Sequence, residues 1–441
     1  MLLLVVFVLS VTRYGSSKRL LAVFRPRSRH TSSVLPLSHF TLPHLEFNAL
    51  SGTEGDKGKT WQGRPHPFFE DSFYRDMFQV LEVSGAPDPA LGLATLLVGL
   101  FEVLDEGEPP DISKRYPELA EQISRGSGTV VVASQPHLTR QEESSFRGTF
   151  CLGGTSHGKA SQKQDKDDLY TFSINVGGGD VVVTRRILTG LASPAQPRSL
   201  PVPSALRRPS AGVLGKFSLS RLPFVTPTAM EPELGLIMAS FARAHLASVI
   251  LDPFAGCGSI LLAGAMLQAK WAPSRSHAEL IAVDIDLDAS SMLENFAAVG
   301  LPPPARATLC RADSLGLLRG GEGSEEGDLS TLTSRLLGTV DCIITDPPYG
   351  IKEALRGNNS NDETPVKVVL GMAERLLRPG GRCAFWTPAV LNQRYEPIPL
   401  PPCSSLRLVL DCEQTLSPTL SRRLVVVEKN SKGFFEHLDN F

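Results

Sequence analysis

Over roughly its last 220 residues, the chain alternates short apolar runs typical of strands with longer runs typical of helices. Strands that alternate with helices form a mostly parallel sheet covered on both faces. The last two strand-like runs have no long helix between them, which predicts an antiparallel hairpin at the edge of that sheet. We therefore predict an α/β, Rossmann-like doubly wound domain over residues 223–435. The expected strands are 248–251, 279–283, 307–310, 340–344, 381–386, 406–410 and 422–427, with helices at 259–268, 289–298 and 364–377.

Residues 46–190 have a different pattern, which predicts a separate α+β module ahead of the doubly wound domain. An apolar run over 87–104 with proline near its start predicts a helix. A β-branched run at 129–133 predicts a strand. Alternating residues at 170–176 and 180–187, on either side of a run of three glycines, predict a hairpin.

Residues 191–222 are rich in Pro and Ser and predict a linker. Between Val181 and Met230 there are seven Arg or Lys residues and no Asp or Glu, although the whole chain has a formal net charge of −2. A stretch of one sign neutralises phosphates and so favours a nucleic-acid partner. A basic linker that only keeps the chain in solution explains the same pattern, and both interpretations stay open.

The N-terminal 45 residues begin with an apolar run over 1–11, and no acidic residue precedes Glu46. That run is too short to span a bilayer, so no membrane association is expected. The acid-free, basic stretch is compatible with an organellar transit segment; alternatively, 19–24 is a first strand and the protein is cytoplasmic. Seven cysteines are present, none in a Cys-x-x-Cys pair, so no metal site is expected.

The first strand of the doubly wound domain runs into the glycine-rich turn Asp252-Pro253-Phe254-Ala255-Gly256-Cys257-Gly258. In such sheets the ligand binds at this turn, beyond the carboxyl end of the strand. Gly256 and Gly258 allow a close backbone approach to the ligand. The turn lacks the third glycine of dinucleotide sites, and Asp252 suits a cationic ligand that carries an amino acid better than it suits a phosphate.

Acidic residues also end the next two strands. Asp284 ends the second strand, where a carboxylate typically holds a ribose diol. Asp313 follows the third strand and is placed to reach an adenine amino group. Any one of these acids is equally typical of a helix N-cap. Three acids at successive strand ends favour a nucleoside-bearing cofactor bound along this edge.

The fourth strand ends in Asp346-Pro347-Pro348-Tyr349. The two prolines stiffen the loop and leave its carbonyl groups free as acceptors. Asp346 and a proline carbonyl are expected to accept both N–H bonds of an exocyclic amine and so direct its lone pair toward an electrophile. Tyr349 offers a face on which an unstacked base can lie. This loop therefore predicts transfer of a group to the amino nitrogen of a nucleic-acid base.

The two motifs together resemble those of the amino-methyltransferases, and further segments narrow the resemblance. The run 217–239 is similar to the segment that precedes the first strand in tRNA (guanine-10-N2)-methyltransferases, which are THUMP-containing enzymes with a DPPY motif. Thr345 to Glu353 and Ser421 to Lys429 are similar to their extended motif and C-terminal strand. Lys352 stands where that family usually has arginine, and Pro227 and Ala229 also depart from its pattern.

The resemblance implies S-adenosyl-L-methionine as cofactor and the exocyclic N2 of a guanine in tRNA, at position 10, as the methyl acceptor. It also implies a THUMP-like RNA-binding role for residues 46–190 and a small zinc-containing activator subunit as partner. The alternatives are N-methylation of another RNA or of adenine N6 in DNA, and an inactive RNA-binding subunit, which the intact motifs disfavour. The site residues then expected are Asp346, Pro347, Pro348 and Tyr349 for catalysis, and Asp252, Phe254, Gly256, Gly258, Asp284, Asp313, Thr226 and Thr228 for the cofactor.

Overall fold

The computed structural model divides the chain into two compact units. The first comprises Met1–Ser28 and Ser51–Gly215, and the second comprises Arg29–Leu50 and Lys216–Phe441. Beyond the backbone of the helices and strands named below, the structure describes residues 104–105, 111, 114–115, 217–271, 278–301, 306–318, 329–348, 364–389, 398, 400, 405–414 and 421–430. Within these parts, none of the helices is both long and apolar enough to cross a bilayer.

The first unit contains a six-stranded sheet in the order β1-β2-β6-β9-β8-β7. All neighbouring strands are antiparallel except β7 and β8. The predicted hairpin is confirmed as β8 and β9, and the first strand predicted at 19–24 lies in β2. The strands are β1 Val5–Arg13, β2 Ser16–Phe24, β6 Leu97–Gly107, β7 Thr129–Ser134, β8 Leu169–Asn175 and β9 Val181–Thr189, beside a small sheet of β4 Gly63–Pro65 and β5 Gln79–Leu81.

The helix predicted over 87–104 is wrong where it overlaps β6. Residues from Leu97 onward pair with β2 on one side and with β9 on the other. The overlapping run contains valines and a phenylalanine, which suit a strand flanked on both sides as well as they suit a buried helix. Pairing with distant segments, which a local pattern does not contain, decides between the two.

The second unit contains an eight-stranded sheet in the order β12-β11-β10-β13-β14-β16-β15-β3. The first five strands run parallel, and the pairs β14/β16 and β16/β15 are antiparallel. The predicted doubly wound sheet with an antiparallel hairpin is thus confirmed, and β3 extends it by pairing with β15. The strands are β10 Val249–Asp252, β11 Glu279–Asp284, β12 Ala307–Arg311, β13 Val340–Thr345, β14 Leu377–Ala389, β15 Leu406–Ser417, β16 Leu420–Lys429 and β3 Ser33–Val34.

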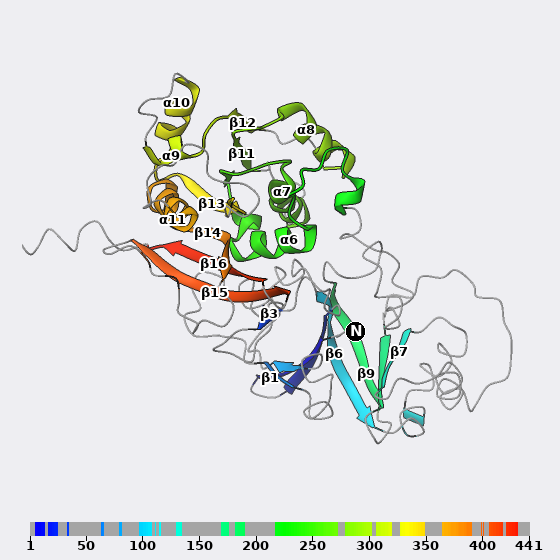
Figure 1. Ribbon diagram of the computed structural model, residues 1–441. Helices are drawn as coiled ribbons and strands as arrows, with labels where there is room; N and C mark the ends of the chain where they lie inside the picture. Colours follow the sequence, from blue (N-terminus) through cyan, green and yellow to red (C-terminus); the bar gives the residue numbers. More distant parts are fainter. Residues whose placement is uncertain are drawn as a thin grey trace, which may run out of the picture. The chain divides into compact units, whose positions relative to one another are not determined.

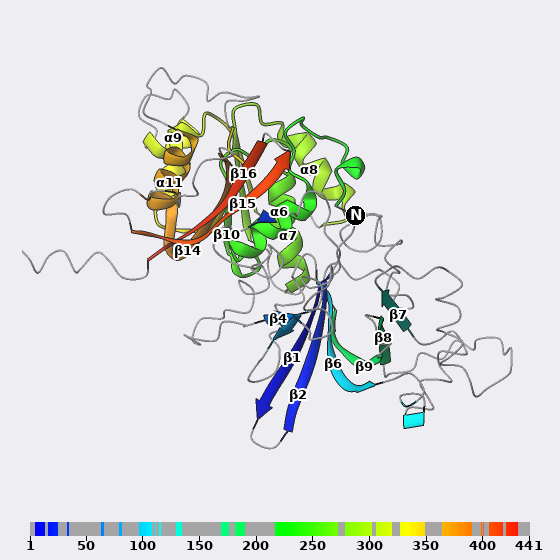
Figure 2. The ribbon, with the colours of Figure 1, turned by 60° about the horizontal axis from the view of Figure 1, so that its bottom comes forward.

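Helices cover both faces of this sheet, with α6, α7 and α8 on one face and α9, α10 and α11 on the other (Figures 1 and 2). The central strand β13 is buried along most of its length, as expected of a parallel strand covered on both sides. The helices are α6 Pro232–Phe241, α7 Ser259–Trp271, α8 Ala289–Ala298, α9 Leu315–Arg319, α10 Gly327–Leu336 and α11 Pro365–Leu376, with short 3-10 turns η5 Leu219–Arg221 and η6 Ala244–Leu246.

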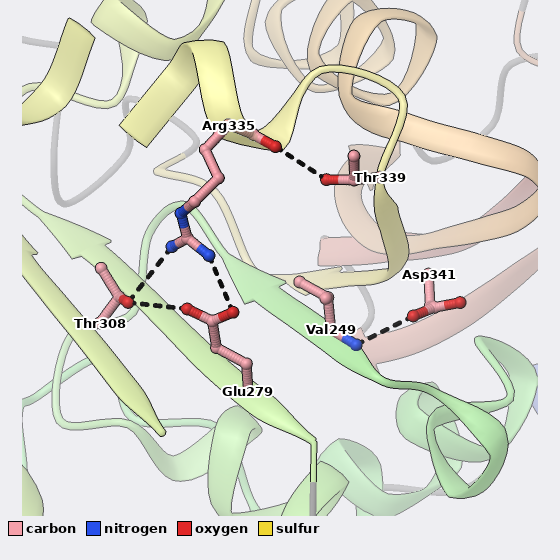
Figure 3. Close-up of polar contacts among 6 residues, drawn as sticks. All are labelled: Val249, Glu279, Thr308, Arg335, Thr339 and Asp341. Carbon is pink, nitrogen blue, oxygen red and sulfur yellow. Dashed lines mark hydrogen bonds and ion pairs between the residues drawn. The ribbon is translucent and has the colours of Figure 1, made fainter. Parts of the chain in front are cut away.

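A polar network ties the amino-terminal ends of the parallel strands together, at the edge of the sheet away from the strand ends that carry the predicted site (Figure 3). Glu279 on β11 accepts hydrogen bonds from Arg335 Nη1 on α10 at 2.8 Å and from Thr308 Oγ1 on β12 at 2.9 Å. The Asp341 carboxylate at the start of β13 accepts the backbone N–H of Val249, which begins β10, at 2.9 Å. These contacts fix strand and helix ends without touching the carboxyl-terminal edge.

Replacing Glu279 by glutamine is expected to lower the free energy of unfolding by about 0.5–1 kcal/mol, because Arg335 is 46% exposed and its ion pair is screened by water. The hydrogen bond from Arg335 is the largest cause that lowers the pKa of Glu279 below its ordinary value of 4.5. Because the pKa of Glu279 is lower in the folded state, this stabilisation is present above pH 4.5 and is lost as the pH falls from 4.5 through the folded-state pKa. Urea unfolding should therefore separate the two proteins more at pH 7 than at pH 3; an equal separation at both would contradict this assignment.

Candidate active site

The carboxyl-terminal ends of β10, β11 and β13 bring three of the predicted acids to one edge of the sheet. Asp252 is the last residue of β10 and is fully buried. Asp284 ends β11, and Asp346 directly follows β13. Since β10 lies between β11 and β13, the carboxylates come from three adjacent strands. The crevice beyond such strand ends is where doubly wound sheets bind ligands.

Asp252 is held by the strand beside it and by its own turn. Its Oδ1 accepts a hydrogen bond from Thr345 Oγ1 at 2.7 Å and from Phe254 N at 3.1 Å. Its Oδ2 is buried and has no hydrogen-bond partner among the described residues. Burial raises the pKa of Asp252 to about 7 against the effect of these two hydrogen bonds, and the negative charges of Asp284 and Asp346 raise it further. A buried acceptor without a partner is costly, and a ligand that donates to Oδ2 would remove that cost.

The glycine-rich turn after β10 adopts the conformation that its glycines permit. Gly256 and Gly258 have φ angles of 50° and 78°, in the left-handed region. The N–H of Gly256 donates to Asp284 Oδ2 at 2.9 Å, and the N–H of Asp286 donates to Asp284 Oδ1 at 2.9 Å. Asp284 therefore joins the end of β11 to the turn after β10, and neither it nor Asp252 begins a helix.

Asp313 differs from the other strand-end acids. Its side chain is exposed, and its Oδ1 accepts the N–H of Leu315, the first residue of α9, at 3.0 Å. It thus has the local helix-start role that its residue type also predicted. The adjacent Ser314 donates its hydroxyl to the carbonyl of Pro253 in the glycine-rich turn, so the start of α9 is tied to the same edge of the sheet.

The segment 217–239 lies against the glycine-rich turn. A Cβ on Gly256 would lie 3.4 Å from Thr226 Oγ1, so the predicted threonine is a direct neighbour of the turn. Thr228 is exposed. Asn295 on α8 holds the segment in place: it is fully buried, it accepts from Phe224 N at 3.0 Å, and its Nδ2 donates to Phe224 O at 2.8 Å and to Cys257 O at 3.0 Å.

Asp346 and the two prolines after it directly follow the carboxyl end of β13, whereas Tyr349, Lys352 and Glu353 fall outside the described residues. Burial raises the pKa of Asp346 to about 7, opposed by the positive charge of Arg422 on β16. Arg422 in turn lies over the ring of Trp386 on β14, with its Cζ 4.2 Å from the ring centroid. The stacking role predicted for Tyr349 stays a prediction.

Sequence patterns did not single out Asn295, Thr345 or Arg422. Asn295 lies in a run that predicts only an amphipathic helix, and Arg422 lies in a run that predicts only a strand. Thr345 carried one local signal, because it directly precedes Asp346 at the end of a buried strand. The contacts of all three residues depend on segments that are distant in the sequence.

Comparison with known proteins shows what the second unit is similar to. Residues 220–392 match the family model described as "RMKL-like, methyltransferase domain". The chain is 30% identical over 261 residues to the tRNA (guanine(10)-N(2))-methyltransferase TRMT11 of Homo sapiens, covering 52% of this chain and 53% of that protein. It is 29% identical over 258 residues to the Bos taurus protein of the same name, covering 52% of each. The chain thus spans about half the length of the curated relatives it matches.

Among solved structures, a possible methylase from Clostridium difficile 630 aligns over 77% of this chain and 86% of its own, with 11% identity and a TM-score of 0.35. A TM-score this low adds nothing to the assignment of fold, which rests on strand order and direction. The relatives and the family model confirm the similarity that the motifs predict. Over residues 220–392 the chain is similar to RMKL-like methyltransferase domains, and over about half its length it is similar to tRNA (guanine(10)-N(2))-methyltransferases.

Proposed function

We propose that this chain is an S-adenosyl-L-methionine-dependent methyltransferase that methylates the exocyclic N2 of a guanine in tRNA, at position 10. The observation that carries the proposal is the position of Asp346. It follows β13 beside the buried Asp252, at the same strand-end edge as Asp284. One edge of the sheet therefore presents both the carboxylates that would hold the cofactor, Asp252 and Asp284, and the loop that begins at Asp346, which we call the acceptor loop.

The residues present fit S-adenosyl-L-methionine. The partnerless Oδ2 of Asp252 suits a methionine ammonium group, and Asp284 suits a ribose diol. Asp313 is available to the adenine amino group. The turn lacks the third glycine of dinucleotide sites, which disfavours a pyrophosphate there. When bound, the cofactor would supply an electrophilic methyl group on a sulfonium.

The residues of this chain would then make the amine a nucleophile. The lone pair of guanine N2 is delocalised into the ring. The Asp346 carboxylate and the carbonyl of Pro347 would accept the two N–H bonds, concentrate electron density on nitrogen and direct its lone pair along the line of attack. A positioned acceptor that is already desolvated lowers the barrier because it needs no reorganisation during the reaction.

Replacing Asp252 by asparagine is expected to stabilise the cofactor-free protein at pH 8 while weakening the binding of S-adenosyl-L-methionine. The pKa of Asp252 is raised, from 3.8 to about 7, so the stability linked to its protonated form is lost as the pH rises through that range. Asparagine carries no charge and avoids that loss, which amounts to about 4 kcal/mol above pH 7 because each pKa unit corresponds to about 1.4 kcal/mol. Urea unfolding at pH 5 and pH 8, with calorimetry of cofactor binding, measures both effects. A variant that is less stable than the wild type at pH 8 would contradict the cost assigned to the ionised group.

The choice of tRNA as substrate is supported by the similarity to the curated relatives and by the basic stretch before Met230. Incubation of the chain with a labelled methyl donor and separate pools of RNA, DNA and protein tests the substrate class. Label is expected in the tRNA fraction. Label confined to DNA would favour the adenine alternative, and no label in any pool would remove the support for an active enzyme.

We further propose that the first unit has a THUMP-like role in binding tRNA and that the chain works with a small zinc-containing activator subunit. The similarity of the second unit to tRNA-modifying relatives supports the RNA-binding role. A partner is supported by β12, which ends the eight-stranded sheet and has no second neighbouring strand among the described residues. An open strand edge can accept a strand of another chain. Purification of the full chain from its native cells, with mass and zinc analysis of what accompanies it, tests the partner. A chain that purifies alone and is fully active would contradict it.

A further inference from the structure

The acceptor loop has a charged neighbour, Arg422, on strand β16 of the antiparallel hairpin. In the sheet, β14 separates β16 from β13, the strand that ends at the loop. Thr345, the last residue of β13, is in register with Phe385 of β14, so Asp346 leaves the sheet beside Trp386. On the other side of β14, Trp386 pairs with Leu424 of β16, and Pro388 pairs with Arg422. Residues two apart on a strand share a face, so Arg422 is a diagonal neighbour of Trp386.

Contacts on both sides fix the position of Arg422. Its guanidinium carbon lies 4.2 Å from the centroid of the Trp386 ring, a cation–π contact. Its Nε donates to Oε1 of the fully buried Gln414 on β15 at 2.8 Å. Trp386 is itself fully buried and donates its indole N–H to Met238 Sδ on α6 at 3.1 Å. An arginine held in this way keeps its charge at the strand end and does not turn toward solvent.

The charges around Asp346 make this arginine significant. The negative charge of Asp346 raises the pKa of Asp252 at the end of β10. Two carboxylates this close to each other therefore disfavour each other's ionisation. Burial raises the pKa of Asp346 to about 7, and Arg422 is the group that lowers it. In the same way, burial lowers the pKa of Arg422 and the charge of Asp346 raises it. Each side chain therefore stabilises the charged form of the other in a place that otherwise disfavours charge.

The ionisation state decides what Asp346 can do. An ionised carboxylate only accepts hydrogen bonds, whereas a protonated one also donates and has less acceptor capacity. If the proposed function holds, an amine that offers two N–H bonds needs the ionised form. We propose that Arg422 is a positioning residue that keeps the Asp346 carboxylate ionised and oriented as an acceptor for the target amine.

Infrared titration of the cofactor-free protein tests this proposal without any substrate. The difference between wild type and Asp346→Asn isolates the carbonyl stretch of protonated Asp346 as the pH is varied. Arg422→Met is expected to move that titration upward by about one pH unit or more, since a nearby opposite charge typically lowers a carboxyl pKa by 1–3 units. Arg422→Lys keeps a charge and is expected to restore much of the shift. Arg422→Gln, which also removes the charge but keeps a polar side chain, serves as the test variant if the methionine variant does not fold.

Arg407→Met is the matched control. Arg407 lies on β15, is 56% exposed and pairs with Glu428. Its replacement removes one arginine from the same hairpin without changing the surroundings of Asp346. Its titration should coincide with that of the wild type. An unchanged Asp346 titration in Arg422→Met, or in Arg422→Gln if only that variant folds, would overturn the proposal.

Methyl transfer gives the second readout. In Arg422→Met the acid limb of kcat should move to higher pH, with activity lost about 5-fold or more at pH 7 and largely regained at pH 9, because a carboxyl whose pKa rises by about one unit from about 7 is about one-tenth ionised at pH 7 and mostly ionised at pH 9. A loss of activity that is the same at every pH would overturn the positioning role. If no RNA is methylated at all but the infrared midpoint still shifts, the proposed function fails while the coupling between the two side chains stands.

Discussion

Methyl transfer is expected to fall by at least about 10³-fold when Asp346 is replaced by alanine, while S-adenosyl-L-methionine still binds. Alanine removes the carboxylate that would accept an N–H bond of the target amine and direct its lone pair. The cofactor site that we propose consists of Asp252, Asp284 and the glycine-rich turn, whose own contacts do not involve Asp346. Single-turnover rates with tRNA, together with calorimetry of cofactor binding, measure the two effects separately.

Asparagine at the same position makes the test sharper. Asp346→Asn keeps the size of the side chain and one acceptor oxygen but loses the charge, so its rate should lie between those of alanine and the wild type. Glu279→Gln, at the opposite edge of the sheet, controls for a change of one acid to an amide and should retain full activity. Activity of Asp346→Ala within a few-fold of the wild type would disprove the catalytic assignment.

Asn295→Leu is expected to be the most damaging substitution outside the acceptor loop. It removes three hydrogen bonds from a fully buried position, and leaves the backbone groups of Phe224 and the carbonyl of Cys257 without that partner. Each unsatisfied buried group costs about 1–3 kcal/mol, so the free energy of unfolding should fall by about 2–4 kcal/mol. Affinity for S-adenosyl-L-methionine should fall about 10-fold as well, because Thr226 and the glycine-rich turn lose their link to α8.

Leu293→Asn, on the same helix, is the matched control. Leu293 is 42% exposed, so a polar side chain there should change neither stability nor cofactor affinity by much. Urea unfolding and calorimetry of both variants at one pH compare them directly. If Asn295→Leu is destabilised but binds the cofactor as tightly as the wild type, Asn295 supports the fold and does not organise the site.

The sequence predicted the second unit well because its signals are local. Each strand of the parallel sheet is a short apolar run that ends in a turn, and the helices α7, α8 and α11 lie in the longer runs between these strands. Acids at the ends of β10, β11 and β13 could be assigned to one edge, because parallel strands bring their carboxyl ends together. The prediction that Asp252, Asp284 and Asp346 lie at this edge needed nothing beyond this topology, whereas their roles stay predictions.

Other features depend on contacts that no local pattern contains. The segment from Leu97 is a strand because β2 and β9 pair with it, although its composition also suits a helix. The buried position of Asn295 depends on a chain segment 71 residues away. Arg422 is placed against Trp386 by the register of β14 and β16. Helix α10 lies partly in a Gly-, Glu- and Ser-rich stretch that gives little helical signal.

The most direct test is the identity of the methylated nucleoside. Unmodified tRNA incubated with the full chain and S-adenosyl-L-methionine carrying an isotopically labelled methyl group is digested and analysed by mass spectrometry. Labelled N2-methylguanosine is the expected product, absent with Asp346→Ala and absent from a tRNA whose guanosine at position 10 is replaced by adenosine. Labelled N6-methyladenosine in place of N2-methylguanosine would contradict the proposed function.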